Sequence, residues 1–148
     1  SATGITLTEA NYETLRNQLR NQDDDKGMKI DTSPTHVIIP IELQKTAEII
    51  FKSNLRSGTA DNDFNPYQGT VTVVPWIYLG DTSTTAWFVL DKEQMNFLWF
   101  FRDRVEFKND DTFDTEVKLY KARERFSNGW ADCRGFVGSK GDGASYSG

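Results

Sequence analysis

Strand-like alternation in the last third of the chain is the feature that most limits its fold. Between positions 97 and 108 one set of alternate positions holds Phe97, Trp99, Phe101, Val105 and Phe107, and the other holds Arg102, Arg104, Glu106 and Lys108. Positions 97, 99 and 101 cannot share one face of a helix, but they lie on one face of a strand. The pattern predicts a long strand with one face buried, within a region from 87 to 141 that is mostly strand. Turns are expected near 109–112 and at 128–129.

Patterns upstream of this region predict a helix, a strand and a second helix. Thr6 and Glu9 form a T-x-x-E capping box that would begin a helix ending near Asn21. Gly27 suits a turn that needs positive φ. Residues 35–39 read as a short buried strand, and Pro40 suits the first turn of the second helix.

The remaining segments read as a loop, a strand and a turn. Residues 54–69 form a long polar loop, 71–77 form a further strand, and 80–85 form a turn before the strand that begins at Trp87. The glycine- and serine-rich end after Gly138 is expected to be frayed. Together these elements predict an α+β fold.

Composition limits the function classes that remain. With 148 residues, 37% of them hydrophobic, the chain is expected to form a single domain around one core. The net charge of −5 disfavours general nucleic-acid binding. Cys133 is the one cysteine, which excludes an intrachain disulfide, and a buried structural role is expected for it. No apolar run approaches the roughly 18 residues that a membrane helix needs.

The sequence gives no complete catalytic or metal-binding set. His36 has no assignable partner that would orient it as a general base. Asp61, Asp63 and Asn65 have the spacing of a calcium loop, but Pro66 and Thr72 occupy the positions that need glycine and glutamate. The tail glycines 138, 141 and 143 precede no helix that could hold a phosphate. We therefore expect no catalytic, metal or cofactor-binding residues.

Two features indicate surfaces for recognition. Lys121, Arg123 and Arg125 occupy alternate positions and form a basic stripe, which fits either an intersubunit ladder of ion pairs or a solvated strand face. The four tryptophans are Trp76, Trp87, Trp99 and Trp130, and we expect three of them to pack in the core or at an interface.

Several short motifs follow one another in a characteristic order. They are Leu7-Thr8 at the first helix, Pro34-Thr35-His36-Val37-Ile38-Ile39-Pro40, Val71-Thr72-Val73-Val74-Pro75, Trp87-Phe88-Val89-Leu90-Asp91, and R-E-R-F-S-N-G-W-A-D-C-R-G over 123–135. This ordered set resembles the carboxy-terminal part of a tailed-bacteriophage major capsid protein of the Mu type. The set covers nearly the whole chain, and the P-T-H-x-I-x-P and G-W-x-D-x-R-G segments are its most specific parts.

The resemblance implies a structural subunit of a phage or prophage shell. Residues 6–116 would correspond to a mixed α/β axial domain, 117–138 to strands returning to the peripheral-domain sheet, and 139–148 to a flexible tail. Partners would be copies of the same subunit in pentamers and hexamers that enclose DNA, together with scaffold and portal proteins, without sequence-specific nucleic acid, membrane or cofactor. The subunit would assemble in the bacterial cytoplasm and reside in the virion.

The same resemblance implies specific contacts and missing parts. Asp61 and Asp63, in the polar loop, would line the capsomer centre, and Lys121, Arg123 and Arg125 would contact neighbouring subunits. The amino-terminal arm and the extended loop of such proteins are expected upstream of Ser1.

Three alternatives remain open from the sequence. Encapsulin-like shell proteins share the implied fold. A small carbohydrate-binding module could use exposed Trp76 and Trp130 as stacking platforms. An enzyme with His36 as its base is the third.

Overall fold

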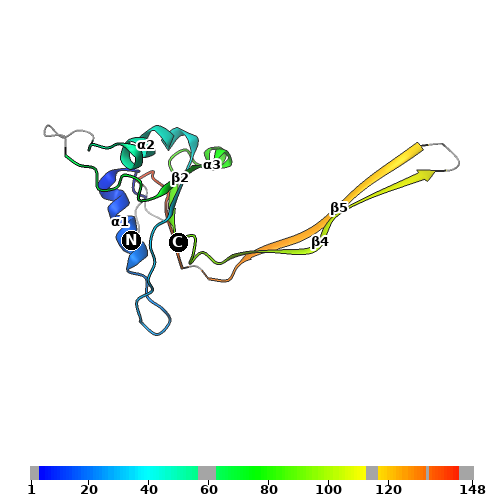
Figure 1. Ribbon diagram of the computed structural model, residues 1–148, viewed down its shortest axis with the longest axis horizontal. Helices are drawn as coiled ribbons and strands as arrows, with labels where there is room; N and C mark the ends of the chain where they lie inside the picture. Colours follow the sequence, from blue (N-terminus) through cyan, green and yellow to red (C-terminus); the bar gives the residue numbers. More distant parts are fainter. Residues whose placement is uncertain (1–3, 57–62, 113–116, 133, 144–148) are drawn as a thin grey trace. The chain divides into compact units, whose positions relative to one another are not determined.

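The computed structural model describes residues 4–56, 63–112, 117–132 and 134–143. Contacts divide the chain into two compact units, Ser1–Met95 with Arg134–Gly148, and Asn96–Cys133. We call them the core unit and the hairpin unit (Figure 1). The single domain that we expected from the length and composition stays a prediction.

A four-stranded sheet organises the core unit. Its strands are β1 (His36–Ile39), β2 (Thr72–Pro75), β3 (Trp87–Leu90) and β6 (Phe136–Ser139), in the order β2-β1-β3-β6. β1 is parallel to β2 and antiparallel to β3, and β3 is antiparallel to β6. Val37 and Val89 face each other on neighbouring strands and are both fully buried, so the centre of the sheet is apolar.

The helices of the core unit are α1 (Glu9–Arg20), the short 3-10 helix η1 (Ile41–Leu43), α2 (Gln44–Lys52) and α3 (Ile77–Thr82). Tyr12, Leu15 and Leu19 of α1 are buried, as are Ala47 and Phe51 of α2. These side chains join Val37, Ile39, Trp87 and Val137 in one hydrophobic cluster. The core therefore lies between the sheet and the α1 and α2 helices, as an α+β fold requires.

The first helix begins two residues later than the capping box predicts. Thr8 is the N-cap, and its Oγ1 accepts a hydrogen bond from the backbone N of Asn11 at 3.3 Å. The expected cap, Thr6, instead accepts from the side chain of Asn11 through its carbonyl oxygen. The expected end is confirmed, with Asn21 as the C-cap and Gly27 at φ 76° in the following turn.

Three local expectations need correction. Residues 77–82 form α3, where we expected the end of a strand and a turn. Residues 109–112 and 128–129, which we expected to be turns, lie inside long strands. The polar residues there suggested turns, but exposed strands accept polar side chains on both faces.

The end of the chain also differs from the expected frayed tail at residues 139–143. Ser139 is 4% exposed, and its Oγ accepts a hydrogen bond from the backbone N of Ile5 and donates one to the carbonyl oxygen of the same residue. The backbone N of Gly143 donates to the carbonyl oxygen of Gly4 at 2.7 Å. These hydrogen bonds tie the residues that follow β6 to the start of the described chain. Residues 144–148 lie outside the described part.

The hairpin unit consists of two long antiparallel strands, β4 (Phe97–Thr112) and β5 (Val117–Trp130), which pair only with each other in the described chain (Figure 1). The register shifts twice, between Phe101 and Asp103 and between Asp103 and Glu106. Each shift places one extra residue on β4, as in a β-bulge. One bulge would move the following β4 side chains to the opposite face, and the second bulge moves them back. Phe101 and Phe107 therefore lie on the same face, opposite Phe126 and Ala122 of β5.

Candidate functional site

One face of the hairpin carries aromatic side chains along most of its length, and we call it the aromatic face. Residues directly opposite in an antiparallel pair lie on the same side of the sheet. Phe97 faces Trp130, Phe101 faces Phe126, and Phe107 faces Ala122. The aromatic members of this face are Phe97, Trp99, Phe101, Phe107, Tyr120, Phe126 and Trp130.

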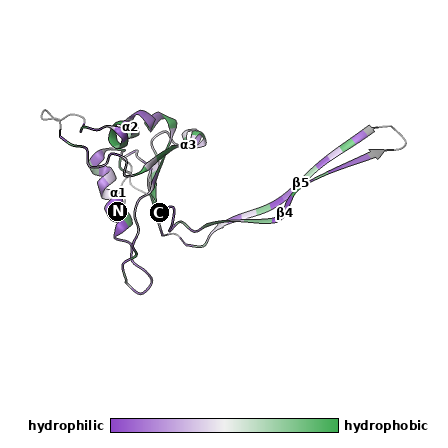
Figure 2. Cartoon of the chain, in the orientation of Figure 1, coloured by the Kyte–Doolittle hydropathy of each residue, from purple (hydrophilic) through white to green (hydrophobic). Residues whose placement is uncertain are grey.

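The aromatic rings pack against one another but remain accessible. The Trp99 ring stacks on Phe126 with centroids 4.7 Å apart, and Phe97 lies 4.8 Å from Trp130. Trp99 is nevertheless 47% exposed and Phe107 is 79% exposed. The alternation that we predicted is present, but the aromatic side chains are exposed rather than half buried, so the expectation of a buried face is wrong for the described chain. Figure 2 shows apolar and polar residues interspersed along both strands.

The opposite side of the hairpin carries the predicted basic stripe, and we call it the charged face. Lys121, Arg123 and Arg125 are all exposed there. Arg123 forms an ion pair with Asp103 at 3.3 Å. In the strand register Arg125 faces Asp103, and Lys121 faces Lys108. Neither Arg125 nor Lys121 forms an ion pair within the described residues. The three basic residues predicted from the sequence therefore lie on one face, and Arg123 is the one whose charge is paired within the described residues.

The two other predicted contact residues belong to the polar loop of the core unit. Asp61 lies outside the described residues. Asp63 is exposed, and its carbonyl oxygen accepts a hydrogen bond from the backbone N of Arg56 at 2.8 Å. The Arg56 side chain bonds Glu9 at 3.0 Å, and this bond raises the pKa of the guanidinium above its ordinary value. Asp63 belongs to the core unit and the basic stripe to the hairpin unit.

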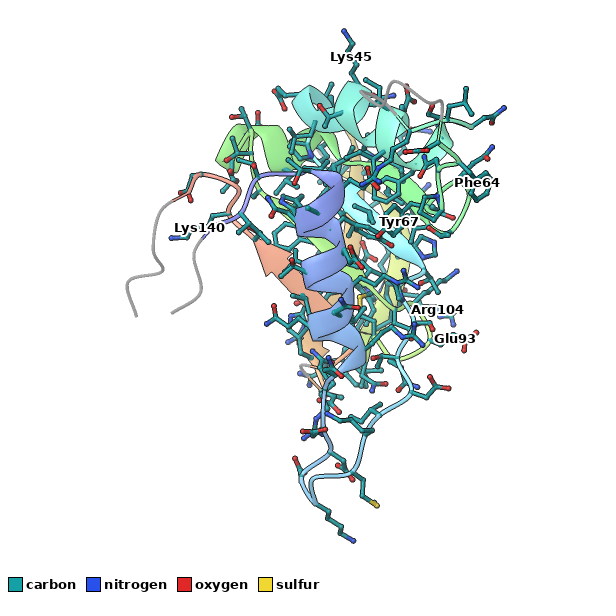
Figure 3. All side chains as sticks on the ribbon, turned by 90° about the vertical axis from the view of Figure 1, so that its left-hand side faces the viewer. Lys45, Phe64, Tyr67, Glu93, Arg104 and Lys140 are labelled. Carbon is teal, nitrogen blue, oxygen red and sulfur yellow. The ribbon has the colours of Figure 1, made fainter. Side chains whose placement is uncertain are left out.

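The former calcium-loop candidate Asn65 has a structural role. Its side chain is buried and donates to the carbonyl oxygens of Ile50 and Ser53 at 2.7 and 2.9 Å, while its Oδ1 accepts from the backbone N of Tyr67. Figure 3 shows Tyr67 within the unit and Phe64 at its periphery, where Phe64 is 73% exposed. Asn65 thus fixes the returning end of the loop to α2.

The described residues contain no group of three or more side chains suited to hold a metal ion. His36 contacts the Thr35 hydroxyl at 2.9 Å from a strand that is half buried at that point. Cys133 lies outside the described residues. None of the described helices is long and apolar enough to cross a membrane.

We expected three of the four tryptophans in the core or at an interface, and the structure places one of them in the core. Trp87 alone among the four is fully buried, with its Nε1 donating to the carbonyl oxygen of Ile5 at 2.8 Å. Trp76, Trp99 and Trp130 are 51%, 47% and 58% exposed. Trp76 and Trp130, the pair that a carbohydrate module would need, belong to different units. Sequence reasoning also missed the exposed Ile77 and Tyr78 on α3, because Ile77 was assigned to a strand and Tyr78 to no element.

Exposed aromatic side chains gathered on one face of a two-stranded ribbon are typical of a site that binds another molecule. The family model described as phage capsid protein matches residues 1–138. The chain belongs to this family, and its role is that of a structural protein of the phage head, located in the virion. The searches of curated proteins and of solved structures found no significant match.

Proposed function

We propose that copies of this chain associate with one another to build the capsid shell, and that the aromatic face of the hairpin packs on a neighbouring copy. Eleven of the twenty large apolar side chains that are exposed in the described chain lie on the hairpin. An isolated two-stranded hairpin is at best marginally stable in water. The observation that carries the proposal is therefore a long two-stranded ribbon whose aromatic side chains are exposed.

The area of the aromatic face suits such a contact. Aromatic side chains bury about 150–250 Å² each, so five half-exposed rings offer on the order of 500 Å². A stable protein contact buries about 800 Å² on each partner. The face would supply more than half of one side of a contact, and a capsid subunit has many copies of itself as neighbours.

The finer assignment follows from the sequence motifs. Their order supports a Mu-type head subunit of a phage or prophage and a place in the carboxy-terminal part of such a subunit. On this proposal the copies form pentamers and hexamers around DNA, with scaffold and portal proteins as further partners, after assembly in the bacterial cytoplasm. Residues 6–116 serve as the axial part, 117–138 return to the peripheral-domain sheet, and Asp61 and Asp63 face the capsomer centre.

Two neighbouring phenylalanines provide a matched test. Phe101 is 54% exposed on the aromatic face, and Phe100 is 58% exposed on the other side of β4. Phe101→Ser should raise the concentration needed for assembly about tenfold, as expected for a central aromatic contact. Phe100→Ser should leave it near that of the unchanged chain. Light scattering over a concentration series, with electron microscopy of the products, measures both.

The opposite ranking of the two variants would show that the wrong face has been assigned. If the unchanged chain remains monomeric at every concentration tested, self-association itself is contradicted.

A further inference from the structure

The outer edge of β4 is an unpaired strand edge. β4 pairs with β5 on one side, and no described strand lies on its other side. From Glu106 to Thr112 the register with β5 runs without a shift, so this part of the edge is regular. Unpaired regular edges expose backbone groups that can pair with another strand.

The charges along this edge are self-complementary. The sequence from 104 to 110 is R-V-E-F-K-N-D, in which charges at equal distances from the central Phe107 have opposite signs. When a strand pairs with an antiparallel copy of itself, residues at equal distances before and after the centre face each other. Glu106 then faces Lys108 of the second copy, within the regular part of both strands. In the same register Arg104, which lies in the irregular part before Glu106, comes opposite Asp110. Each of these pairs occurs twice.

We propose that two copies of this chain pair antiparallel along their β4 edges, with Phe107 on the two-fold axis. This proposal rests on the proposed self-association and adds the strand, the register and the symmetry of one contact. The same patch serves both copies, as a two-fold interface requires. The product is a four-stranded sheet in the order β5-β4-β4-β5.

The charges within one hairpin support β4 rather than β5 as the pairing edge. Lys108 faces Lys121 across the hairpin, and like charges in directly opposite positions are destabilising. Lys108 forms an ion pair with Glu106 of its own strand at 3.3 Å. The second copy brings another Glu106 to it. Self-pairing of β5 centred on Arg123 would instead place Lys121 opposite Arg125, which is unfavourable.

The apolar side of the edge gains cover from the same arrangement. Phe107 and Tyr120 are each 79% exposed, the highest values among the large apolar residues of the described chain. On the two-fold axis the Phe107 rings of both copies meet on the aromatic face. Three or more strands with an apolar face are more stable than a lone hairpin.

Disulfide trapping of the full chain tests the register directly. In a Cys133→Ser background, Phe107→Cys places its two copies directly opposite, with Cα atoms about 4.5–5.5 Å apart. A disulfide needs about 4.4–6.8 Å. Asn109→Cys is the matched control, because its two copies are offset by four residues, about 13 Å along the strand. We expect a covalent dimer from Phe107→Cys and none from Asn109→Cys.

Charge reversal tests the pairing independently. Lys108→Glu faces Lys121 within its own hairpin, so a purely local role predicts a more stable hairpin. The proposed pairing predicts weaker association of the two copies, because the Glu106 carboxylate of each copy then faces the carboxylate introduced at position 108 of the other. We expect association to be about tenfold weaker. Glu106→Lys should weaken association similarly. An equimolar mixture of the two variants should associate as tightly as the unchanged chain, because each variant complements the other.

The outcomes separate this inference from the proposed function. A dimer from Phe107→Cys, together with recovery in the mixture, supports the pairing. If the chain still self-associates but gives no such dimer and is indifferent to both charge reversals, the β4 pairing is overturned and the proposed function stands. If the unchanged chain does not self-associate at all, both are overturned.

Discussion

Tyr12 joins α1 to α2 and to the loop before β2. Its ring centroid lies 4.8 Å from that of Phe51 and 5.4 Å from that of Tyr67, both in edge-on arrangements. The side chain is 1% exposed, and this burial raises the pKa of the Tyr12 hydroxyl above its ordinary value, because a buried phenolate loses hydration. Burial raises the pKa of Tyr67 in the same direction. The centre of the core unit therefore contains two tyrosines that resist ionisation.

This burial predicts a loss of stability at alkaline pH. The folded state holds the Tyr12 proton more tightly than the unfolded chain does, so the contribution is complete below the unfolded pKa of about 10. The stabilising contribution of the protonated Tyr12 is lost as pH rises from about 10 through the higher pKa that Tyr12 has in the folded state. The free energy of unfolding should therefore fall above pH 10, and Tyr12→Phe should reduce that fall. Urea unfolding between pH 8 and 11 measures it.

A control for this prediction is Tyr78→Phe, since Tyr78 is 72% exposed on α3. It should leave the alkaline loss as it is in the unchanged chain. An equal effect of both substitutions would show that burial of Tyr12 is not the cause.

At the scale of elements, the packing of β6 on β3 depends on a glycine. Gly138 faces Phe88, whose ring stacks on Phe136 with centroids 5.2 Å apart. A Cβ at position 138 would overlap the Phe88 ring. Gly138→Ala should therefore force the ring aside and lower the free energy of unfolding by about 1–3 kcal/mol. Thermal and urea unfolding measure the change.

Gly129→Ala is the matched control in β5, because a Cβ there meets no atom within 4 Å. Its effect on stability should stay within about 0.5 kcal/mol. If Gly138→Ala is equally neutral, the close approach of Phe88 does not restrict that position.

The long strand shows what sequence periodicity determines and what it does not. Alternation correctly indicated which side chains share a face, even for Phe101 and Phe107, because the two bulges cancel. It did not reveal what covers that face, since burial is a property of the neighbours and not of the strand. The same reason explains why the exposure of Trp99 was not predicted.

The wrong prediction of a strand end and a turn where α3 lies has a different cause. This helix has six residues and includes Gly80, so it is too short for a 3.6-residue pattern to be recognised. By contrast, β1 and α2 follow from the Thr35 to Pro40 motif and the apolar stripe after it. Of the predicted contact residues, the basic stripe was placed correctly on one face because it rests on strand parity. Nothing in the sequence linked it to the loop that holds Asp63.

At the scale of the whole molecule, the hydrophobic cluster belongs entirely to the core unit. Its members come from the segment before Met95 and from β6, and none comes from β4 or β5. The core unit therefore has what a folded domain needs, whereas the hairpin has exposed rings and a ladder of backbone hydrogen bonds. This division predicts that folding and assembly are separable.

Excision of the hairpin tests that separation. Asn96 and Ala131 lie side by side at its base, where the backbone N of Ala131 donates to the carbonyl oxygen of Asn96 at 2.9 Å. Replacing residues 97–130 with a short Gly-Ser turn keeps every member of the hydrophobic cluster. The free energy of unfolding should change by less than about 1 kcal/mol, as for surface changes, while assembly is abolished. Circular dichroism during urea unfolding and light scattering measure the two effects, and loss of a cooperative transition would show that the core unit needs the hairpin to fold.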